Sequence, residues 1–461
     1  MFGKVLIANR GEIAVRVARA CRELGVRTVA VYSTEDKDSA VVRLADEAVH
    51  IGPGPARKSY LNIAAVVEAA RMTGADAVHP GYGFLSEDAD FAEVCQDNGF
   101  TFIGPPPAVI AQLGDKTAAR QLMADTGMPM LPGSREPLRS AEEAHELADR
   151  IGYPVIIKAA AGGGGRGMTV VRQTEDFVRA YRETSAGAQI LFGDYRVFVE
   201  RYLSSARHVE IQILCDSYGN AVHLGERDCS VQRRHQKLVE ESPAPGLPAD
   251  LVDQMGQVAV AGAKAAGYVG AGTFEFLVDE HGGFSFMEVN CRIQVEHPVT
   301  ELVTGIDLVR EQLVIAAGGR LSVEQQDVVR RGAAIECRIN AEDPDRSFAP
   351  APGVLDEFVP AGGPFVRVDT HGYPGYRVPA IYDSLLAKLL TWAPTRAEAI
   401  ARMDRALAEF RVSGPGVRTT MPFLRRVIAD ERFAAGTHDT TIVDRLSDND
   451  WRGVPCRELP L

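Results

Sequence analysis

Two carboxylates interrupt a pair of apolar segments in the second half of the chain. Glu275 lies in T-F-E-F-L-V and Glu288 in F-S-F-M-E-V-N, and the intervening D-E-H-G-G is typical of a hairpin turn. Such a hairpin would place both carboxylates side by side, where they need a compensating cation. Asn290 shares the side of Glu288 by the strand period of two. Because Mg²⁺ prefers oxygen ligands and keeps phosphates in its shell, the pattern predicts a nucleotide–metal site. A pair of buried salt bridges is the alternative.

A polar loop follows this hairpin directly. Arg292, Gln294, Glu296 and His297 add a cation, an amide and a possible base within a few residues. Such a concentration of polar groups beside paired acids favours a functional site over isolated structural ion pairs.

Lys158 ends an apolar strand just before the loop A-A-A-G-G-G-G-R-G-M. Consecutive glycines let backbone N–H groups approach phosphate oxygens and let the loop act as a lid. A lysine beneath that loop supplies a point charge for the same phosphates. The lysine precedes the glycines, so this is not a G-x-x-x-x-G-K-[ST] loop, and a merely flexible turn is the alternative. Lys116, at a predicted helix start, is by itself more typical of a solvated lysine.

Residues 226–241 form a polar stretch that is expected to lie between strands. Gln232, Arg234, His235 and Lys237 crowd donors into it. This excess of cations in an acidic protein favours a groove that binds an anion, with a solvated charged face as the alternative.

Three more polar residues lie in strand-like segments. His208 and Glu210 alternate on one face of R-H-V-E-I-Q-I, and each alone is more typical of a structural residue. Arg338 lies in E-C-R-I-N-A-E-D-P, where spacing alone favours an ion pair with Glu336 on the same face. The alternative is that Arg338 stabilises negative charge developing on a ligand.

The bulk composition limits the classes of function. The chain has 461 residues, enough for two to four domains, and a formal net charge of −12. That charge disfavours nonspecific binding to nucleic acid or anionic membrane. Seven cysteines without a C-x-x-C pair argue against a disulfide framework or zinc site. With no signal peptide and no membrane-spanning stretch in the sequence, we expect a cytoplasmic protein.

Residues 1 to about 114 alternate predicted strands and helices. K-V-L-I-A, T-V-A-V-Y-S and A-D-A-V-H-P read as strands, and Gly11 opens a helix. This alternation predicts a parallel sheet wrapped by helices. The first turn has one glycine, so dinucleotide binding is not expected. The turn P-G-Y-G at 80–83, ending in Ser86-Glu87, either lines a site or is a plain tight turn.

Later regions differ in pattern. From Gly114 to about 203 a small unit contains the glycine-rich loop between two strands, and a strand-rich region with helices runs to about 330. A mixed α and β region begins beyond Gly332. The last fifteen or so residues lack periodicity and are expected to form a tail.

Taken in order, these segments resemble one family, the biotin carboxylases of the ATP-grasp superfamily. The matching stretches are I-A-N-R-G-E-I-A-V-R-V, H-P-G-Y-G-F-L-S-E, G-D-K, K-A-A-A-G-G-G-G-R-G-M, R-H-V-E-I-Q, E-R-D-C-S-V-Q-R-R-H-Q-K, N-C-R-I-Q-V-E-H-P-V-T-E and Y-D-S-L-L-A-K. The resemblance implies an α/β and α+β protein with an ATP-grasp fold. Its expected domains are a Rossmann-like pre-ATP-grasp domain at 1–114, the ATP-grasp domain at 115–330 with a lid at about 131–203, a mixed α/β C-terminal domain at 331–446, and a tail at 447–461.

The resemblance also implies a reaction in which ATP phosphorylates bicarbonate to carboxyphosphate, and the carboxyl group then passes to N1′ of biotin. The residues implied to hold ATP are Lys116, Lys158, Gly164, Gly165, Glu200, Arg201, Tyr202, Leu203, His208, Gln232 and His235, together with Glu275 and Glu288. Those implied to ligate Mg²⁺ or Mn²⁺ are Glu275, Glu288 and Asn290. Those implied to surround bicarbonate are Lys237, Arg292, Gln294 and the Val295 backbone.

Two residues are implied to act in the chemistry together with Lys237 and Arg292. Glu296 would be the general base for bicarbonate, and Arg338 would stabilise the biotin enolate after the released phosphate removes the N1′ proton. The chain departs from the commoner pattern at Arg201, at Cys291 and in the longer turn between the metal acids. Arg201 keeps its charge, and Cys291 could make the site sensitive to oxidation.

No Met-Lys-Met biotin attachment site occurs and no carboxyltransferase-sized region follows. We therefore expect a free-standing subunit, commonly a homodimer in this family, that works with a biotin carboxyl carrier protein and carboxyltransferase subunits. A multisubunit acetyl-CoA or acyl-CoA carboxylase is the leading assembly, with no nucleic acid or membrane partner. The alternatives are a subunit of a pyruvate or other biotin-dependent carboxylase, an ATP-grasp ligase for another acceptor, and a non-catalytic nucleotide-binding subunit.

Overall fold

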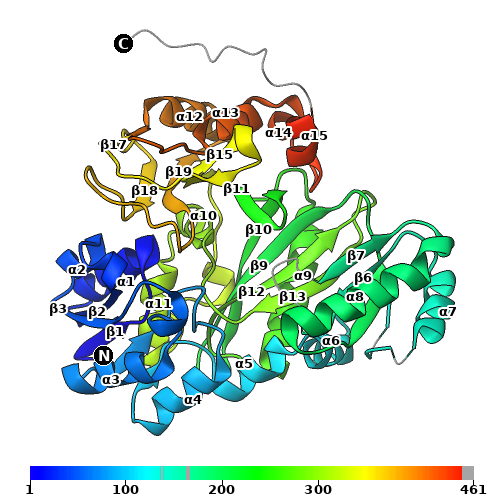
Figure 1. Ribbon diagram of the computed structural model, residues 1–461, viewed down its shortest axis with the longest axis horizontal. Helices are drawn as coiled ribbons and strands as arrows, with labels where there is room; N and C mark the ends of the chain where they lie inside the picture. Colours follow the sequence, from blue (N-terminus) through cyan, green and yellow to red (C-terminus); the bar gives the residue numbers. More distant parts are fainter. Residues whose placement is uncertain (135, 139, 162–166, 449–461) are drawn as a thin grey trace.

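The computed structural model describes residues 1–134, 136–138, 140–161 and 167–448 (Figure 1). Its N-terminal part is the predicted parallel sheet, in the order β3-β2-β1-β4-β5. The strands are β1 (Lys4–Ile7), β2 (Arg27–Ser33), β3 (Glu47–Gly52), β4 (Ala77–His79) and β5 (Thr101–Phe102). The helices of this part are α1 (Gly11–Glu23), α2 (Ala40–Leu44), α3 (Ile63–Thr73), α4 (Ala89–Asp97) and α5 (Pro107–Gly114).

Alternate residues of the short central strand β1 face opposite sides of this sheet. Val5 and Ile7 pack with the apolar stripe of α1, whereas Leu6 packs with the side of the sheet that α3 covers. Helix α3 begins at the Asn62 cap, whose side chain accepts from the Ala65 amide, and ends at Gly74 in the left-handed conformation. The strand period of two and the helical spacing of apolar residues, both visible in the sequence, therefore decide which side chains pack between the sheet and the helices on each side.

A small three-stranded antiparallel sheet contains the strand of Lys158. It has the order β7-β6-β8, with β6 (Val155–Ala159), β7 (Met168–Val171) and β8 (Val197–Arg201). Helices α7 (Ala141–Ile151) and α8 (Phe177–Phe192) pack against it, at the right of Figure 1. Its separate core of buried side chains, including Val155, Phe177 and Val199, makes it a compact unit.

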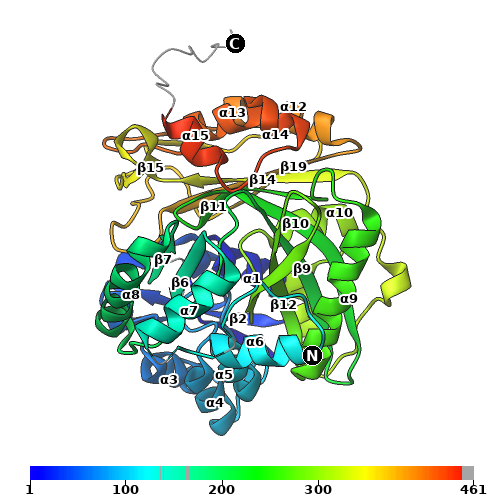
Figure 2. The same ribbon diagram turned by 90° about the vertical axis from the view of Figure 1, so that its right-hand side faces the viewer.

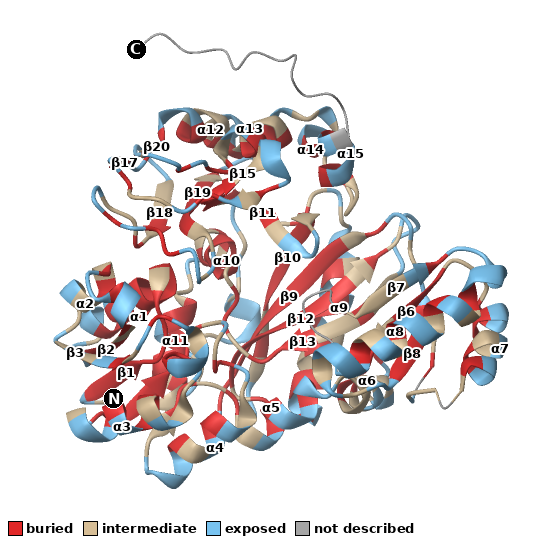
Figure 3. Ribbon diagram, in the orientation of Figure 1, coloured by how far each residue is buried: buried red, intermediate tan, exposed pale blue. Residues whose placement is uncertain are grey.

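The largest element is an antiparallel sheet of eight strands in the order β13-β12-β9-β10-β11-β14-β19-β18. Its strands are β9 (Arg207–Cys215), β10 (Ala221–Arg233), β11 (Gln236–Ser242), β12 (Gly270–Val278), β13 (Phe284–Asn290), β14 (Ala333–Asn340), β18 (Val366–Thr370) and β19 (Leu385–Ala393). Strands β9, β10 and β12 are buried along most of their length (Figure 3). Because β11 pairs with β14, the C-terminal strands continue the central sheet directly.

Helices cover this sheet on both sides. Those of the central part are α6 (Lys116–Asp125), α9 (Ala249–Ala265), α10 (His297–Thr304) and α11 (Leu308–Ala316). Those of the C-terminal part, which lie together above β14 and β19 in Figure 2, are α12 (Arg396–Glu409), α13 (Met421–Ala429), α14 (Glu431–Ala435) and α15 (Ile442–Asp448). Two short ribbons complete the described fold, β15 (Glu342–Asp343) with β16 (Ala349–Pro350), and β17 (Glu357–Val359) with β20 (Arg411–Ser413). The predicted tail lies outside the described residues from 449 onward.

Within the described ranges, none of the helices has the length and apolar character needed to cross a membrane.

One buried histidine makes the stability of the N-terminal part depend on pH. His79 at the end of β4 is fully buried, and its Nδ1 accepts from the Gly81 amide at 3.0 Å. Burial, helped by the nearby Arg16 cation, lowers the pKa of His79 to about 3. The unfolded chain, with an ordinary histidine pKa of about 6.5, therefore binds more protons between these values, and stability falls as the pH falls.

We expect this histidine alone to remove about 2 kcal/mol of unfolding free energy between roughly pH 7 and pH 5. Urea unfolding of the wild type and a His79→Gln variant at both pH values measures the effect. The stability gap between the two proteins should narrow at the lower pH by about that amount. An unchanged gap would mean that His79 already binds its proton in the folded state.

Candidate active site

The predicted hairpin is confirmed, and it brings the two acids together. Strands β12 and β13 pair in a register that sets Glu275 opposite Glu288. The turn is closed by Asp279, whose side chain accepts from the amides of residues 281 and 283. Asn290 donates from Nδ2 to Glu275 Oε1 at 2.9 Å, so it lies on the expected side.

Lys237 on β11 supplies a cation to Glu275, the first of these two acids. Its Nζ lies 2.7 Å from Glu210, 3.0 Å from Glu275 and 2.5 Å from Glu296, all measured to carboxylate oxygens. Burial alone would lower the pKa of Lys237, but the surrounding carboxylates raise it well above its ordinary value. Lys237 is therefore a fixed positive charge at the point where three strands and the polar loop meet.

Glu296 is fully enclosed, and a second cation holds it from the C-terminal side. Its other oxygen accepts from Arg338 Nη2 at 2.8 Å. Burial alone would raise the pKa of Glu296, but Lys237 and Arg338 hold it well below its usual range. The group is thus an ionised carboxylate with no proton of its own.

The sequence pattern favoured Glu336 as the ion-pair partner of Arg338, and this was wrong. Arg338 Nε instead donates to Glu240 on β11 at 2.6 Å, in addition to its bond with Glu296. Neither carboxylate oxygen of Glu336 has a hydrogen-bond partner among the described residues, and burial raises its pKa well above the ordinary value. The neighbouring strand, and not the same strand, provides the partner.

The polar loop after β13 is held by the glycine turn of the N-terminal part. Glu87 accepts from Arg292 Nε at 2.7 Å and from the Cys291 amide at 2.9 Å. Arg292 in turn donates to Gln294 Oε1 at 2.8 Å. The segment that ends the 80–83 turn therefore contacts the loop directly, which supports the site interpretation of that turn. Cys291 itself is buried, and burial raises its pKa, which disfavours a reactive thiolate.

Two lysines predicted for phosphates lie on different elements. Asp115 caps α6 and so fixes Lys116 in its first turn, where Nζ lies 3.5 Å from Glu288. Lys158 Nζ lies 2.6 Å from Glu200, which also pairs with Arg120. The Glu200 side chain is almost fully buried by these contacts, so it anchors Lys158.

The other residues predicted to lie near the adenine are at the end of β8 and just after it. The Tyr202 amide donates to the Pro154 carbonyl at 3.0 Å, and the Arg201 side chain reaches the Ile151 carbonyl. Tyr202 and Leu203 are half-buried. Gly164 and Gly165 lie outside the described residues.

Residues 226–241 were expected to lie between strands, and that expectation was wrong. The segment forms most of β10 and β11 themselves, joined by a tight turn in which Arg234 and His235 have positive φ. Gln232 pairs with Lys237 across this turn. Burial, aided by the nearby His208 and Lys158 cations, lowers the pKa of His235. The donors thus line one end of a hairpin that leads into the site.

His208 and Glu210 do share one face of a strand, β9, and both are buried. His208 Nε2 lies 3.0 Å from Glu275, and although burial lowers the pKa of His208, Glu275 raises it. His208, Glu210 and Glu275 offer ligand atoms within 4.8 Å of one another. Lys237 already bridges two of these acids, so this trio is neutralised by side chains.

Three residues that sequence reasoning did not assign to the site belong to this network. Arg227 is fully buried and contacts Glu210 and Gln212, the latter at 2.7 Å. Glu240 is also fully buried, and burial raises its pKa to about 7. Lys388 lies opposite Arg338 on β19. Arg227 and Lys388 lie in two of the stretches that carry the family resemblance, and all three residues are charges within strands, but neither signal reveals the partner of a charge.

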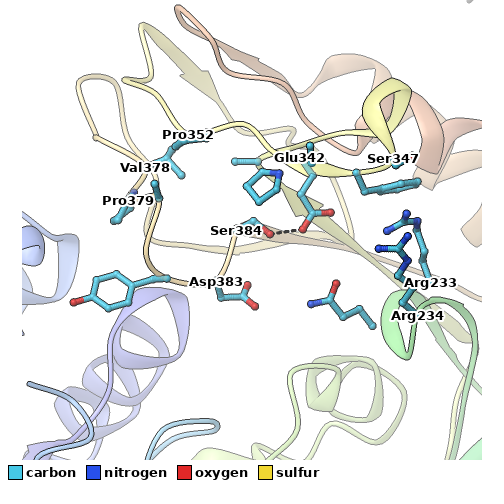
Figure 4. Close-up of a pocket in the computed structure, with 16 residues that line it drawn as sticks. Arg233, Arg234, Glu342, Ser347, Pro352, Val378, Pro379, Asp383 and Ser384 are labelled. Atoms are coloured by element: carbon cyan, nitrogen blue, oxygen red, sulfur yellow. Dashed lines mark hydrogen bonds between the residues drawn. The ribbon is translucent and has the colours of Figure 1, made fainter. Parts of the chain in front are cut away.

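An open groove of about 410 Å³ adjoins this network, and its lining includes Arg234, one of the donors of the 226–241 stretch that were predicted to line a groove (Figure 4). It lies between the β10–β11 turn and C-terminal loops, and its lining includes Arg233, Gln236, Glu342, Phe348, Pro352 and Ser384. Ser384 donates to Glu342 at 2.5 Å at its centre. Glu342 lies four positions beyond Arg338 in sequence, so the groove borders the outer end of the strand that carries this arginine.

Family models match nearly the whole chain. Residues 1–110 match the model described as biotin carboxylase, N-terminal domain. Residues 115–324 match carbamoyl-phosphate synthase L chain, ATP binding domain, and residues 336–445 match the biotin carboxylase C-terminal domain.

Curated relatives and solved structures agree with these models. Biotin carboxylase 1 of Bacillus subtilis is 53% identical over 445 residues, covering 96% of this chain and 98% of that protein. Biotin carboxylase of Haemophilus influenzae is 54% identical over 437 residues, with coverages of 95% and 97%. The Campylobacter jejuni biotin carboxylase complex with β,γ-ATP superposes with a TM-score of 0.94 at 46% identity, covering 96% and 99%. The biotin carboxylase domain dimer of Hydrogenobacter thermophilus 2-oxoglutarate carboxylase, solved with MgADP, ADP and bicarbonate, gives 0.93 at 47% identity, covering 96% and 98%.

Proposed function

This chain belongs to the biotin carboxylase family, with an ATP-grasp fold, and we propose that it carboxylates biotin carried on a separate chain, using ATP and bicarbonate. It is an ATP-dependent ligase. The observation that carries the proposal is the convergence of Lys237, Glu296 and Arg338, from two strands and a loop, on one enclosed point.

The first step assigned to these residues is the activation of bicarbonate. Lys237, Arg292, Gln294 and the Val295 backbone hold the anion, and the ionised Glu296 accepts its proton. The freed oxygen attacks the γ-phosphorus of ATP, the bond to ADP breaks, and carboxyphosphate forms. Lys237 and Arg292, the two cations that hold the anion, stabilise the negative charge that develops on it, and they need no rearrangement to do so.

The second step assigned here transfers the carboxyl group. The C–O bond of carboxyphosphate breaks to give CO₂ and phosphate, the phosphate removes the N1′ proton of biotin, and N1′ then bonds to the carbon of CO₂. The negative charge of the enolate falls on the ureido oxygen. Arg338, whose guanidinium is held by Glu240 and Glu296, is the cation placed to stabilise that charge.

The donor set on the hairpin fits a divalent cation. Glu275 and Glu288 face each other across paired strands, and Asn290 lies beside them. All three offer oxygen, the ligand type that Mg²⁺ and Mn²⁺ accept, so we propose that they hold the metal. When bound, the metal supplies positive charge to the ATP phosphates. Lys116 and Lys158 would hold the same phosphates, and residues 200–203, at the end of β8 and just after it, would hold the adenine.

The partners and setting are proposed on chemical grounds. Biotin would arrive on a biotin carboxyl carrier protein and leave for a carboxyltransferase, as in an acetyl-CoA or other acyl-CoA carboxylase. We also propose a homodimer. The six cysteines in the described part of the chain are all buried and free, which supports a reducing cytoplasm.

ATP hydrolysis by the purified chain tests this function. We expect hydrolysis to require bicarbonate and to be accelerated by free biotin. Hydrolysis that ignores bicarbonate would overturn the proposal, and a bicarbonate requirement without any response to biotin would indicate another acceptor. Co-purification from native cells with mass spectrometry then identifies the carrier and transferase chains.

A further inference from the structure

Lys388 is a fully buried lysine for which the proposed reaction has no role. It lies on β19 with no exposed surface, and its Nζ donates to the Val295 carbonyl at 2.9 Å. Glu12 of α1 lies 3.0 Å from the same Nζ, and Asp369 of β18 lies 3.9 Å away. Burial alone would lower the pKa of Lys388, but Glu12 raises it, so the group remains an ammonium. Burying an ammonium group is costly unless its donors are used.

The position of Lys388 in the sheet explains what its donors reach. The register of β14 and β19 sets Lys388 directly opposite Arg338. Arg338 bonds the carboxylate of Glu296, and Lys388 bonds the peptide that leads into the same residue. Two cations on adjacent strands therefore hold this part of the loop. Arg338 holds the Glu296 side chain, and Lys388 holds the peptide that joins Val295 to Glu296.

A second contact restrains the preceding peptide. His297 Nδ1 lies 2.7 Å from the Gln294 carbonyl. Burial lowers the pKa of His297 well below the ordinary value, so the ring is neutral. The consecutive carbonyls of Gln294 and Val295 are thus both engaged, the first by His297 and the second by Lys388.

We propose that Lys388 is a positioning residue for the bicarbonate loop, defined as residues 292–297. It fixes the Val295 carbonyl and so orients the peptides that present the Val295 amide and the Glu296 carboxylate to bicarbonate. The inference deepens the proposed function and rests on it for the identity of the anion. Because Glu12 comes from the N-terminal part and Lys388 from the C-terminal part, the contact also joins both ends of the chain behind the loop.

A Lys388→Met variant tests the proposal, since methionine fills similar space without a donor. The KM for bicarbonate in ATP hydrolysis should rise by roughly 10- to 100-fold, the size expected for losing one charge-assisted hydrogen bond. The KM for ATP should stay within about twofold, because in the described part of the chain no contact of Lys388 reaches a predicted ATP residue. A Lys388→Arg variant, which keeps the charge and donors, should recover part of the bicarbonate affinity.

A double variant separates positioning from folding. Lys388→Met leaves Glu12 as an unpaired buried acid, which lowers stability whatever the loop does. Lys388→Met/Glu12→Gln removes both charges and should regain stability while keeping the raised KM for bicarbonate. Arg396→Met is the matched control, because Arg396 also bonds a buried acid (Glu241, 2.6 Å) and a carbonyl (Phe433, 2.6 Å) but lies away from the loop. It should lose stability with the KM for bicarbonate unchanged.

The possible outcomes distinguish this inference from the proposed function. If the wild type shows no bicarbonate-dependent hydrolysis, the proposed function fails first. If the wild type is active and the stable double variant binds bicarbonate as the wild type does, the positioning role is overturned. Equal increases in the KM values for ATP and bicarbonate would also overturn it, since they would reflect general loosening of the site.

Discussion

Replacing Glu296 with glutamine is expected to reduce bicarbonate-dependent ATP hydrolysis by about 10²- to 10⁴-fold, the usual contribution of a positioned general base. Glutamine keeps the size of the side chain, and its single amide oxygen can still accept a hydrogen bond from one of the two cations, Lys237 or Arg338. It cannot take the proton of bicarbonate, so the attacking oxygen stays protonated. The KM for ATP should change little, because Glu296 contacts the cations and not the predicted ATP residues.

Steady-state hydrolysis with varied bicarbonate measures this effect, and Glu241→Gln is the matched control. Glu241 is an equally buried acid on β11, but it pairs with Arg396 and His438, away from the loop. Its replacement should lower stability and leave the bicarbonate-dependent rate within about threefold, since no assigned step uses it. Full activity of the Glu296→Gln variant would remove the assigned base.

Replacing Arg338 with methionine is expected to reduce carboxylation of biotin by about 10²- to 10³-fold, the cost of removing one donor to a developing oxyanion. Hydrolysis of ATP with bicarbonate alone should persist to a larger extent, because the enolate forms only in the second step. The variant also leaves Glu240 and Glu296 without their shared cation, which should lower the unfolding free energy by about 3–5 kcal/mol.

The two effects of the Arg338 replacement can be separated. In Arg338→Met/Glu240→Gln one of the uncompensated acids is neutral, so much of the lost stability should return while carboxylation stays low. Labelled bicarbonate incorporation into free biotin, followed beside phosphate release, measures both steps. A double variant that regains carboxylation together with stability would assign Arg338 a structural role only.

Much of the site was predictable from local patterns. The D-E-H-G-G turn between two apolar segments predicts a hairpin, and a bulge between Glu275 and Phe276 then sets Glu275 opposite Glu288. The alternation of strands and helices required a parallel sheet in the first 114 residues. Asp115 before Lys116 was sufficient to start a helix there. These features depend on residues close in sequence, so the chain determines them without tertiary contacts.

The partner of each charge was decided by the tertiary structure. The strand period indicated that Glu336 and Arg338 share a face, yet Arg338 bonds Glu240 from β11. The polar stretch around Lys237 was expected to be a connection, because its charges hide the strand pattern. In the fold it is a hairpin whose charges meet opposite charges from other strands.

The sequence by itself thus determined the local elements, the acid hairpin, the polar loop and the family. Only the three-dimensional fold decided that β11 pairs with β14, so that one sheet extends from Glu275 and Glu288 to Arg338 and Lys388. The physical reason is that a strand's period fixes which side chains share a face, whereas strand order and register fix which strands are neighbours. Register between segments about a hundred residues apart follows from packing of the whole core, and no short pattern encodes it.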